Sequence, residues 1–133
     1  MSEYTSTHEG FQRAMERSLT GPPEEAEDYV KSITLPTFYQ ITDGHRRTYD
    51  DYFQHIAKRR AQVSKFKPVL HEFLRDGDQL AARMTGTVKL DGPAIEFESF
   101  MFAKVDPESG KLVWLMERLA SSPARAIPDH GAH

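Results

Sequence analysis

The sequence predicts an α+β domain in which helices pack on one face of an antiparallel sheet. Apolar residues recur with a helical period in three segments of the first 63 residues. From Phe66 onward the period becomes two, which is typical of strands that are buried on one side. Turn residues divide this second part into four segments. Helices that precede consecutive strands in the chain favour an α+β arrangement.

A capping-box pattern begins the first predicted helix, because Ser6 is followed three residues later by Glu9. This helix is expected to end near Thr20-Gly21, where glycine suits a helix terminus. Pro22-Pro23 then opens a second helix, since proline is tolerated in a first turn. Its apolar stripe ends before Pro36.

Residues 36–42 are aromatic and β-branched and predict a short strand closed by the turn Asp43-Gly44. Thr48 is a suitable N-cap for a third helix, with acidic residues in its first turn. Four strands follow, connected by short turns in an antiparallel meander. They are expected at about 66–75, 80–90, 95–105 and 111–120.

The length of 133 residues suits a single domain, expected at 1–120 with a C-terminal tail at 121–133. The absence of cysteine excludes disulfides and thiolate metal sites and fits a reducing compartment. No segment reaches the roughly 20 apolar residues of a membrane helix, and the N-terminus lacks a signal-peptide pattern. We therefore expect a cytoplasmic protein with no membrane partner.

The net charge is −3, and acidic and basic residues are interspersed. The one basic cluster, residues 58–60 with Lys65 and Lys67, is interpreted as a solvated helix face. A nucleic-acid interface would need a broader basic surface with exposed aromatic residues. We expect no nucleic-acid partner.

The segment EFLRDGDQLAARMTGT, residues 72–87, resembles a hairpin of the SnoaL-like proteins of the NTF2-like superfamily. Gly110-Lys111-Leu112 is similar to the turn before their last strand. The resemblance covers nearly all of the chain up to about Leu119. It implies a cone-shaped fold with three N-terminal helices on a curved antiparallel sheet and a small-molecule pocket. It also implies no cofactor or metal, and a homodimer formed through the outer sheet face.

Two catalytic sets of this superfamily are not reproduced. Polyketide cyclases of the SnoaL-like group carry an aspartate near the end of the last strand, about where Ala120 stands. Scytalone-dehydratase-like members use two histidines and an aspartate after the first helix, where this chain has Leu19-Thr20. Neither activity can be transferred directly.

The first hairpin places residues on faces of the sheet. If Gly77-Asp78 forms its centre, His71 lies opposite Met84 on the apolar face, while Glu72 pairs with Arg83 on the other face. His71 is then either a core or surface histidine, or a general acid/base, since its side chain titrates near neutral pH.

The face of the next strand depends on the length of the loop at Asp91-Gly92-Pro93. A three-residue loop puts the even-numbered residues of this strand, among them Glu98 and Phe100, on the face of His71. The family resemblance favours this option. A loop of two or four residues puts Phe97, Ser99 and Met101 there instead.

Under the first option Glu98 lies opposite Arg118, with Phe100 opposite Met116 and Phe102 opposite Trp114. The ion pair is either structural, or a base held ionised by a guanidinium that also binds an oxyanion. The expected catalytic residues are therefore His71, Glu98 and Arg118. The expected substrate-binding residues, several of them aromatic, are Tyr39, Tyr52, Met84, Phe100, Trp114 and Met116.

These observations favour a cofactor-independent cyclase, isomerase or dehydratase that moves protons on a small hydrophobic, oxygenated metabolite. The alternative is a non-catalytic ligand-binding or dimerisation accessory domain of the same fold. A transport-factor-like adaptor is the third reading. A pocket that encloses His71 and Glu98 distinguishes the first from the second.

Overall fold

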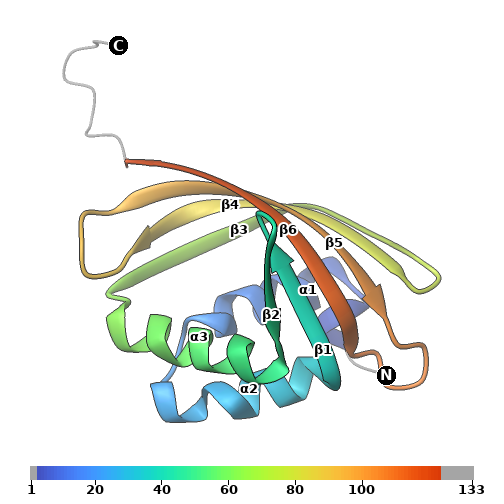
Figure 1. Ribbon diagram of the computed structural model, residues 1–133. Coiled ribbons are helices and arrows are strands. Elements are labelled where there is room, and N and C mark those ends of the chain that lie inside the picture. Colours follow the sequence, from blue (N-terminus) through green and yellow to red (C-terminus); the bar gives the residue numbers. More distant parts are fainter. Residues whose placement is uncertain (1–2, 124–133) are drawn as a thin grey trace.

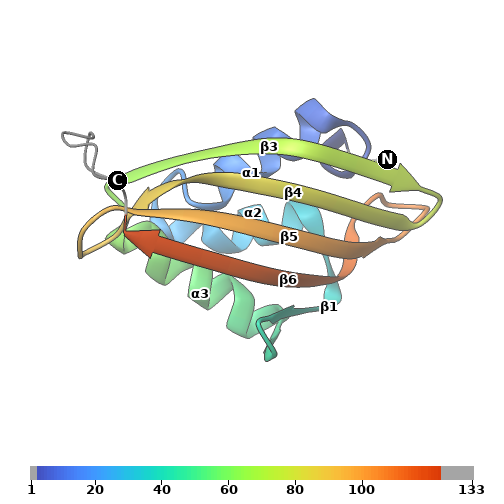
Figure 2. The same cartoon turned by 90° about the horizontal axis from the view of Figure 1, so that it is seen from above.

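Three α-helices lie on one side of a curved six-stranded sheet in the computed structural model, which describes residues 3–123 (Figure 1). The helices are α1 (His8–Ser18), α2 (Ala26–Ile33) and α3 (Tyr49–Gln62). Seen from above, strands β3 to β6 lie side by side over them (Figure 2). One face of the sheet is thus covered by helices, and we call the opposite face the outer face.

The helices begin at polar caps, as predicted, with one shift. Thr7, not Ser6, caps α1, and its hydroxyl accepts a hydrogen bond from the Gly10 amide at 2.9 Å. Thr48 caps α3 in a capping box with Asp51, which confirms the predicted start of that helix. α2 ends at Ile33, before the predicted boundary at Pro36, because β1 already begins at Thr34.

The sheet has the order β2-β1-β6-β5-β4-β3. The predicted meander is confirmed as β3 (Lys65–Asp76), β4 (Gln79–Lys89), β5 (Ile95–Val105) and β6 (Leu112–Pro123). The predicted short strand is β1 (Thr34–Thr42), and it forms a hairpin with β2 (His45–Thr48), which was not predicted. The sheet is mixed, not purely antiparallel, because β1 runs parallel to β6.

The predicted register holds near the first turn and then fails. Glu72 lies opposite Arg83, as expected. A β-bulge between Leu70 and Glu72 then inserts His71 as an extra residue, so Leu70 lies opposite Met84. A bulge changes which side chains face the core beyond it. His71 therefore points to the outer face, and its predicted place on the apolar face is wrong.

The register of the last hairpin differs by two residues from the prediction. Phe100, not Glu98, lies opposite Arg118, and Phe102 lies opposite Met116. A shift of two residues leaves each side chain on its face but changes its partner. The predicted pairing of Glu98 with Arg118 is therefore wrong.

The core lies between the helices and the concave face of the sheet. α1 and α2 contribute their apolar stripes, in which Phe11, Tyr29 and Val30 are almost fully buried. The inward residues of the sheet alternate with outward ones, as in the burial of Leu80 and Ala103. The two layers together enclose one continuous apolar cluster.

β6 continues to Pro123, three residues into the segment predicted as a tail from 121. The rest of that segment, 124–133, lies outside the described residues. Among residues 3–123 no helix has both the length and the apolar character needed to cross a membrane.

Candidate functional site

A cavity of about 280 Å³ lies between α1, α3 and the concave face of the sheet. This volume is slightly below the range of roughly 300–1,000 Å³ that is usual for small-molecule sites. Its apolar wall is formed by side chains of β3 to β6 and of the loop after β4. This wall consists of Phe66, Met84, Val88, Leu90, Ile95, Phe97, Met101, Leu115 and Leu119. The helices add Met15, Ser18, Leu19, Tyr52, His55, Ile56 and Arg59.

Glu117 on β6 is the carboxyl group that lines this cavity. The Ser99 hydroxyl donates to its Oε2 atom at 2.5 Å. Its Oε1 atom accepts from Gln40 Nε2 at 3.4 Å and from Thr42 Oγ1 at 3.5 Å. Glu117 is thus held by neutral donors and not by an ion pair.

Two strand pairings bring these groups together. Thr42 lies directly opposite Glu117 in the parallel β1–β6 pair, and Gln40 is two residues earlier on β1. Ser99 comes from β5, where it lies opposite Leu119 on the same face as Glu117. The site therefore depends on the parallel pairing of β1 with β6, the last strand.

Burial raises the pKa of Glu117 above its ordinary value. The hydrogen bonds from Ser99 and Thr42 favour the ionised form and offset part of this effect. The nearby Asp43 carboxylate raises the pKa further, whereas the Arg47 guanidinium lowers it. A carboxyl group with a raised pKa in an apolar cavity can both give and take a proton closer to neutral pH.

α3 presents Tyr52 and His55 to the same cavity. Burial, followed by the charge of Glu117, raises the pKa of the Tyr52 phenol, so this hydroxyl stays protonated. Burial and the neighbouring cations, Arg47 first, lower the pKa of His55 to about 4. The imidazole is therefore neutral at physiological pH. The cavity offers one neutral O–H donor and one neutral imidazole beside the carboxyl group.

The three predicted catalytic residues lie on the outer face, away from this cavity. His71 Nε2 is 2.6 Å from Thr85 Oγ1. Glu98 accepts from Arg83 Nη1 at 2.9 Å, and Arg83 Nε also pairs with Glu72 at 2.6 Å. Arg118 lies 3.9 Å from Asp43. The three residues line no common cavity, so the geometric basis of their predicted roles is lost.

The predicted substrate-binding residues divide between the two faces. Tyr52 and Met84 line the cavity. Tyr39, Phe100, Trp114 and Met116 belong to the outer face, where the Arg46 guanidinium covers the Tyr39 ring at 3.9 Å. Trp114 contacts the Phe102 ring with centroids 6.3 Å apart. The predicted aromatic surface exists, but on the other side of the sheet.

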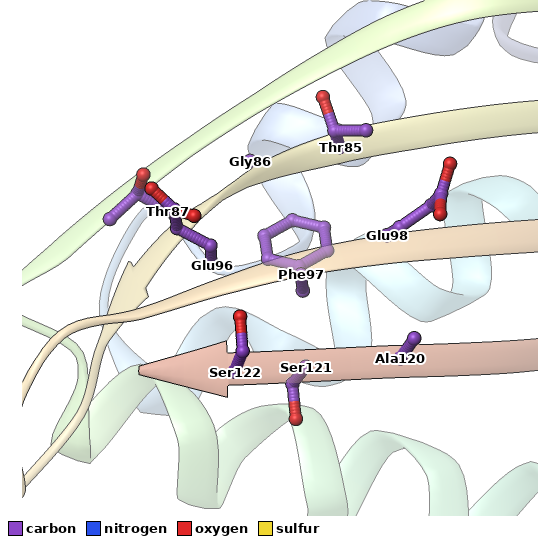
Figure 3. Close-up of a pocket in the computed structure, with 9 residues that line it drawn as sticks. All are labelled: Thr85, Gly86, Thr87, Glu96, Phe97, Glu98, Ala120, Ser121 and Ser122. Carbon is purple, nitrogen blue, oxygen red and sulfur yellow. The ribbon is translucent and has the colours of Figure 1, made fainter. Parts of the chain in front are cut away.

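A larger and shallower hollow of about 600 Å³ lies at the end of β4, β5 and β6. Figure 3 shows Thr85 and Glu98 at its edge, and it shows Ser121 and Ser122 pointing to opposite sides of β6. The hollow is lined mainly by hydroxyls and by the carboxylates Glu96 and Glu98. The smaller internal cavity instead holds the buried carboxyl group of Glu117 in a largely apolar wall, so we place the candidate site there.

Glu117, Ser99, Gln40 and His55 were not among the predicted site residues. One signal was present, because Ser99 interrupts an apolar inward series between Phe97 and Met101. Val88 pairs with Ile95, so an even number of residues separates them and the even-loop option was correct. On β6, Glu117 follows the buried Leu115 by two residues, so the two side chains lie on the same face of the strand. Correct parity would have placed both on the inner face.

Metal chemistry has no evident site in the part of the chain that the structure describes. No group of three or more histidine, aspartate or glutamate side chains there is arranged to hold a metal ion.

No protein-family model and no curated protein matches the sequence. Solved structures do match the fold. BvnE pinacolase from Penicillium brevicompactum has a TM-score of 0.70 at 12% identity, over 86% of this chain and 84% of that chain. An LEH-like epoxide hydrolase of M. tuberculosis has a TM-score of 0.63 at 18% identity, over 82% and 81%.

A putative SnoaL-like polyketide cyclase from Shewanella denitrificans has a TM-score of 0.64 at 10% identity, over 82% of this chain and 89% of that chain. The chain therefore has the NTF2-like fold, as its hairpin and turn sequences indicated. At these identities the likeness concerns the fold, and function must be argued from the site.

Proposed function

We propose that this protein is a cofactor-independent acid–base enzyme that isomerises, cyclises or dehydrates a small hydrophobic, oxygenated molecule. The observation that carries the proposal is a carboxyl group, Glu117, whose pKa is raised by burial in the wall of an otherwise largely apolar cavity. Fold relatives described as a pinacolase, an epoxide hydrolase and a polyketide cyclase support a small-molecule substrate.

In this proposal Glu117 transfers the proton and Tyr52 stabilises the charge that develops on the substrate oxygen. Ionised Glu117 takes a proton from a carbon next to a substrate carbonyl, while the Tyr52 hydroxyl donates a hydrogen bond to the carbonyl oxygen. The proton then returns from Glu117 to another atom of the intermediate, or to a departing hydroxyl group. Ser99 and Gln40 hold the carboxyl group in one orientation throughout.

The test is an untargeted metabolite comparison of a deletion strain with the same strain complemented by one of four proteins. These are the wild type, Glu117→Gln, Glu98→Gln and Glu96→Gln. Glu117→Gln keeps the shape of the side chain and removes its proton transfer, so its profile should match that of the deletion. Glu98→Gln tests the role predicted from the sequence. Glu96→Gln, on the exposed outer face, is the matched control. Full complementation by Glu117→Gln would contradict the proposal.

A non-catalytic accessory domain is the second candidate, and the outer face favours it. Phe100, Phe102 and Met116 are 51%, 46% and 42% exposed and form an apolar surface across β5 and β6. Exposed apolar patches of this kind commonly mark interaction sites. We propose that a second copy of the chain covers this surface in a homodimer. The purified protein and the metabolite that accumulates in the deletion strain distinguish the two candidates. An enzyme would convert this metabolite, whereas a binding domain would bind it unchanged.

A further inference from the structure

Arg59 brings a positive charge to the wall of the cavity, about two helical turns from Tyr52. Tyr52, Ile56 and Arg59 follow one another at spacings of four and three residues, so they lie on one face of α3. All three line the cavity. Tyr52 and Arg59 are seven residues apart, which corresponds to about 10 Å along a helix axis. The cavity therefore has an acid–base end and a cationic end.

The Arg59 guanidinium is not neutralised by a carboxylate in the described part of the chain. None of the ion pairs found among residues 3–123 includes it. Its Nη1 atom donates to the neutral amide oxygen of Gln62 at 2.9 Å. Gln62 in turn donates to the exposed Asp91 carboxylate at 3.0 Å. A guanidinium carries five N–H donors, so most of those of Arg59 remain for a ligand.

Within residues 3–123, Arg59 is the one lysine or arginine side chain that lines this cavity. The other basic side chain of the wall, His55, is neutral, because burial and the neighbouring cations lower its pKa to about 4. The carboxyl group of the wall, Glu117, already accepts hydrogen bonds from Ser99, Gln40 and Thr42. An anion that enters beside α3 thus meets a guanidinium that is not paired with a carboxylate among the described residues.

We propose that the ligand of this cavity is an elongated apolar molecule with an anionic group, a carboxylate or a phosphate, which pairs with Arg59. Its opposite, oxygenated end reaches Tyr52 and Glu117. A guanidinium binds both anions in bidentate geometry, and such charge-assisted hydrogen bonds are about twice as strong as neutral ones. This inference rests on the proposed function only for the choice of the reacting end.

Binding of octanoate, octyl phosphate and the neutral amide octanamide tests the proposal without any turnover. Isothermal titration calorimetry of the full chain at low salt gives the affinities. We expect one anion or both to bind at least about tenfold more tightly than octanamide. Whichever anion binds more tightly identifies the anionic group. Methyl NMR signals of Met84 and Met101, which line the cavity, should shift, and that of Met116 on the outer face should not.

Variants assign the preference to Arg59. Arg59→Gln should reduce the ratio of anion to amide affinity to about one. Arg59→Lys keeps the charge but not the bidentate geometry, so it should retain only part of the ratio. The exposed control Lys58→Gln should retain most of it. Equal affinities in the wild type, an unchanged ratio in Arg59→Gln, or no saturable octanoate binding would overturn the proposal. Glu117→Gln should keep the anion preference, so failure of the catalytic proposal and failure of this one give different results.

Discussion

Ser99 donates its hydroxyl hydrogen to Glu117 across the β5–β6 pair, with 2.5 Å between Oγ and Oε2. Ser99 is fully buried, and Glu117 lines the internal cavity. This bond stabilises the ionised carboxylate in surroundings that otherwise favour its protonated form. The protonation state of the candidate site is therefore set by the balance between burial and this hydroxyl.

Removal of that hydroxyl should raise the pKa of Glu117 further. In Ser99→Ala the carboxylate loses its closest donor, while burial is unchanged. Carboxyl ¹³C NMR titration, with the Glu117 signal assigned by its loss in Glu117→Gln, measures the shift. We also expect a loss of about 1–2 kcal/mol in unfolding free energy for the buried bond. Ser122→Ala, on the exposed face of β6, is the control, and an unmoved Glu117 titration in Ser99→Ala would refute the assigned balance.

The raised pKa of Glu117 makes folding stability pH-dependent. The folded state retains this proton above pH 4.5, the ordinary pKa, whereas the unfolded state loses it. The contribution of Glu117 to stability therefore falls as pH rises from 4.5 through the folded-state pKa, and is constant above it. Urea unfolding of Glu117→Gln between pH 4 and 8 should show a stability that increases relative to wild type over this window. Parallel curves would mean that the carboxyl group titrates normally.

His55 should affect stability in the opposite direction. Its pKa is about 4 in the folded state and about 6.5 when unfolded, so the unfolded state binds more protons between these values. The contribution of neutral His55 is complete above pH 6.5 and is lost as pH falls towards 4. His55→Gln should weaken this loss in urea titrations. His45→Gln, which removes an exposed imidazole on β2, is the matched control, and identical curves for the two variants would be evidence against the effect.

Arg60 should be a major contributor to stability although it lies within the basic cluster. Its guanidinium donates to the carbonyl oxygens of Arg17, Ser18 and Pro22 at 2.6, 3.2 and 3.0 Å, and it is 7% exposed. Arg60→Met leaves these acceptors at the end of α1 without their donor. We expect a loss of about 2–4 kcal/mol in chemical unfolding, against less than about 0.5 kcal/mol for exposed Lys58→Met. Similar losses for both variants would show that the three contacts contribute little.

The outer face gives a prediction about assembly. If a second copy covers Phe100 and Phe102, light scattering should find two chains in the wild type and one in the double variant Phe100→Lys, Phe102→Lys. Lysine at both positions would place charges in a desolvated interface, which is unfavourable without partners. Lys104→Ala, on the same face of β5, should leave the dimer intact. A monomeric wild type, or a dimer that survives the double variant, would exclude this surface as the interface.

The sequence by itself determined the elements and their order. The change of hydrophobic period at Phe66, the Thr48 cap and the glycine-containing turns are local signals, because they follow from backbone preferences of a few adjacent residues. The hairpin at residues 72–87 also indicated the fold that the structural comparisons show. The basic cluster was interpreted as a solvated face, which holds for Lys58 but not for buried Arg60.

Only the tertiary structure decided which side chains meet in the cavity. Successive strand residues point to opposite faces, so one bulged residue at His71, or one residue in the loop before β5, exchanges the inner and outer sets. Glu117 accepts hydrogen bonds from Gln40 and Thr42 because β1 runs beside β6. These two segments are more than 70 residues apart in the sequence. Such pairing depends on how the helices and the whole sheet pack, and no local pattern encodes it.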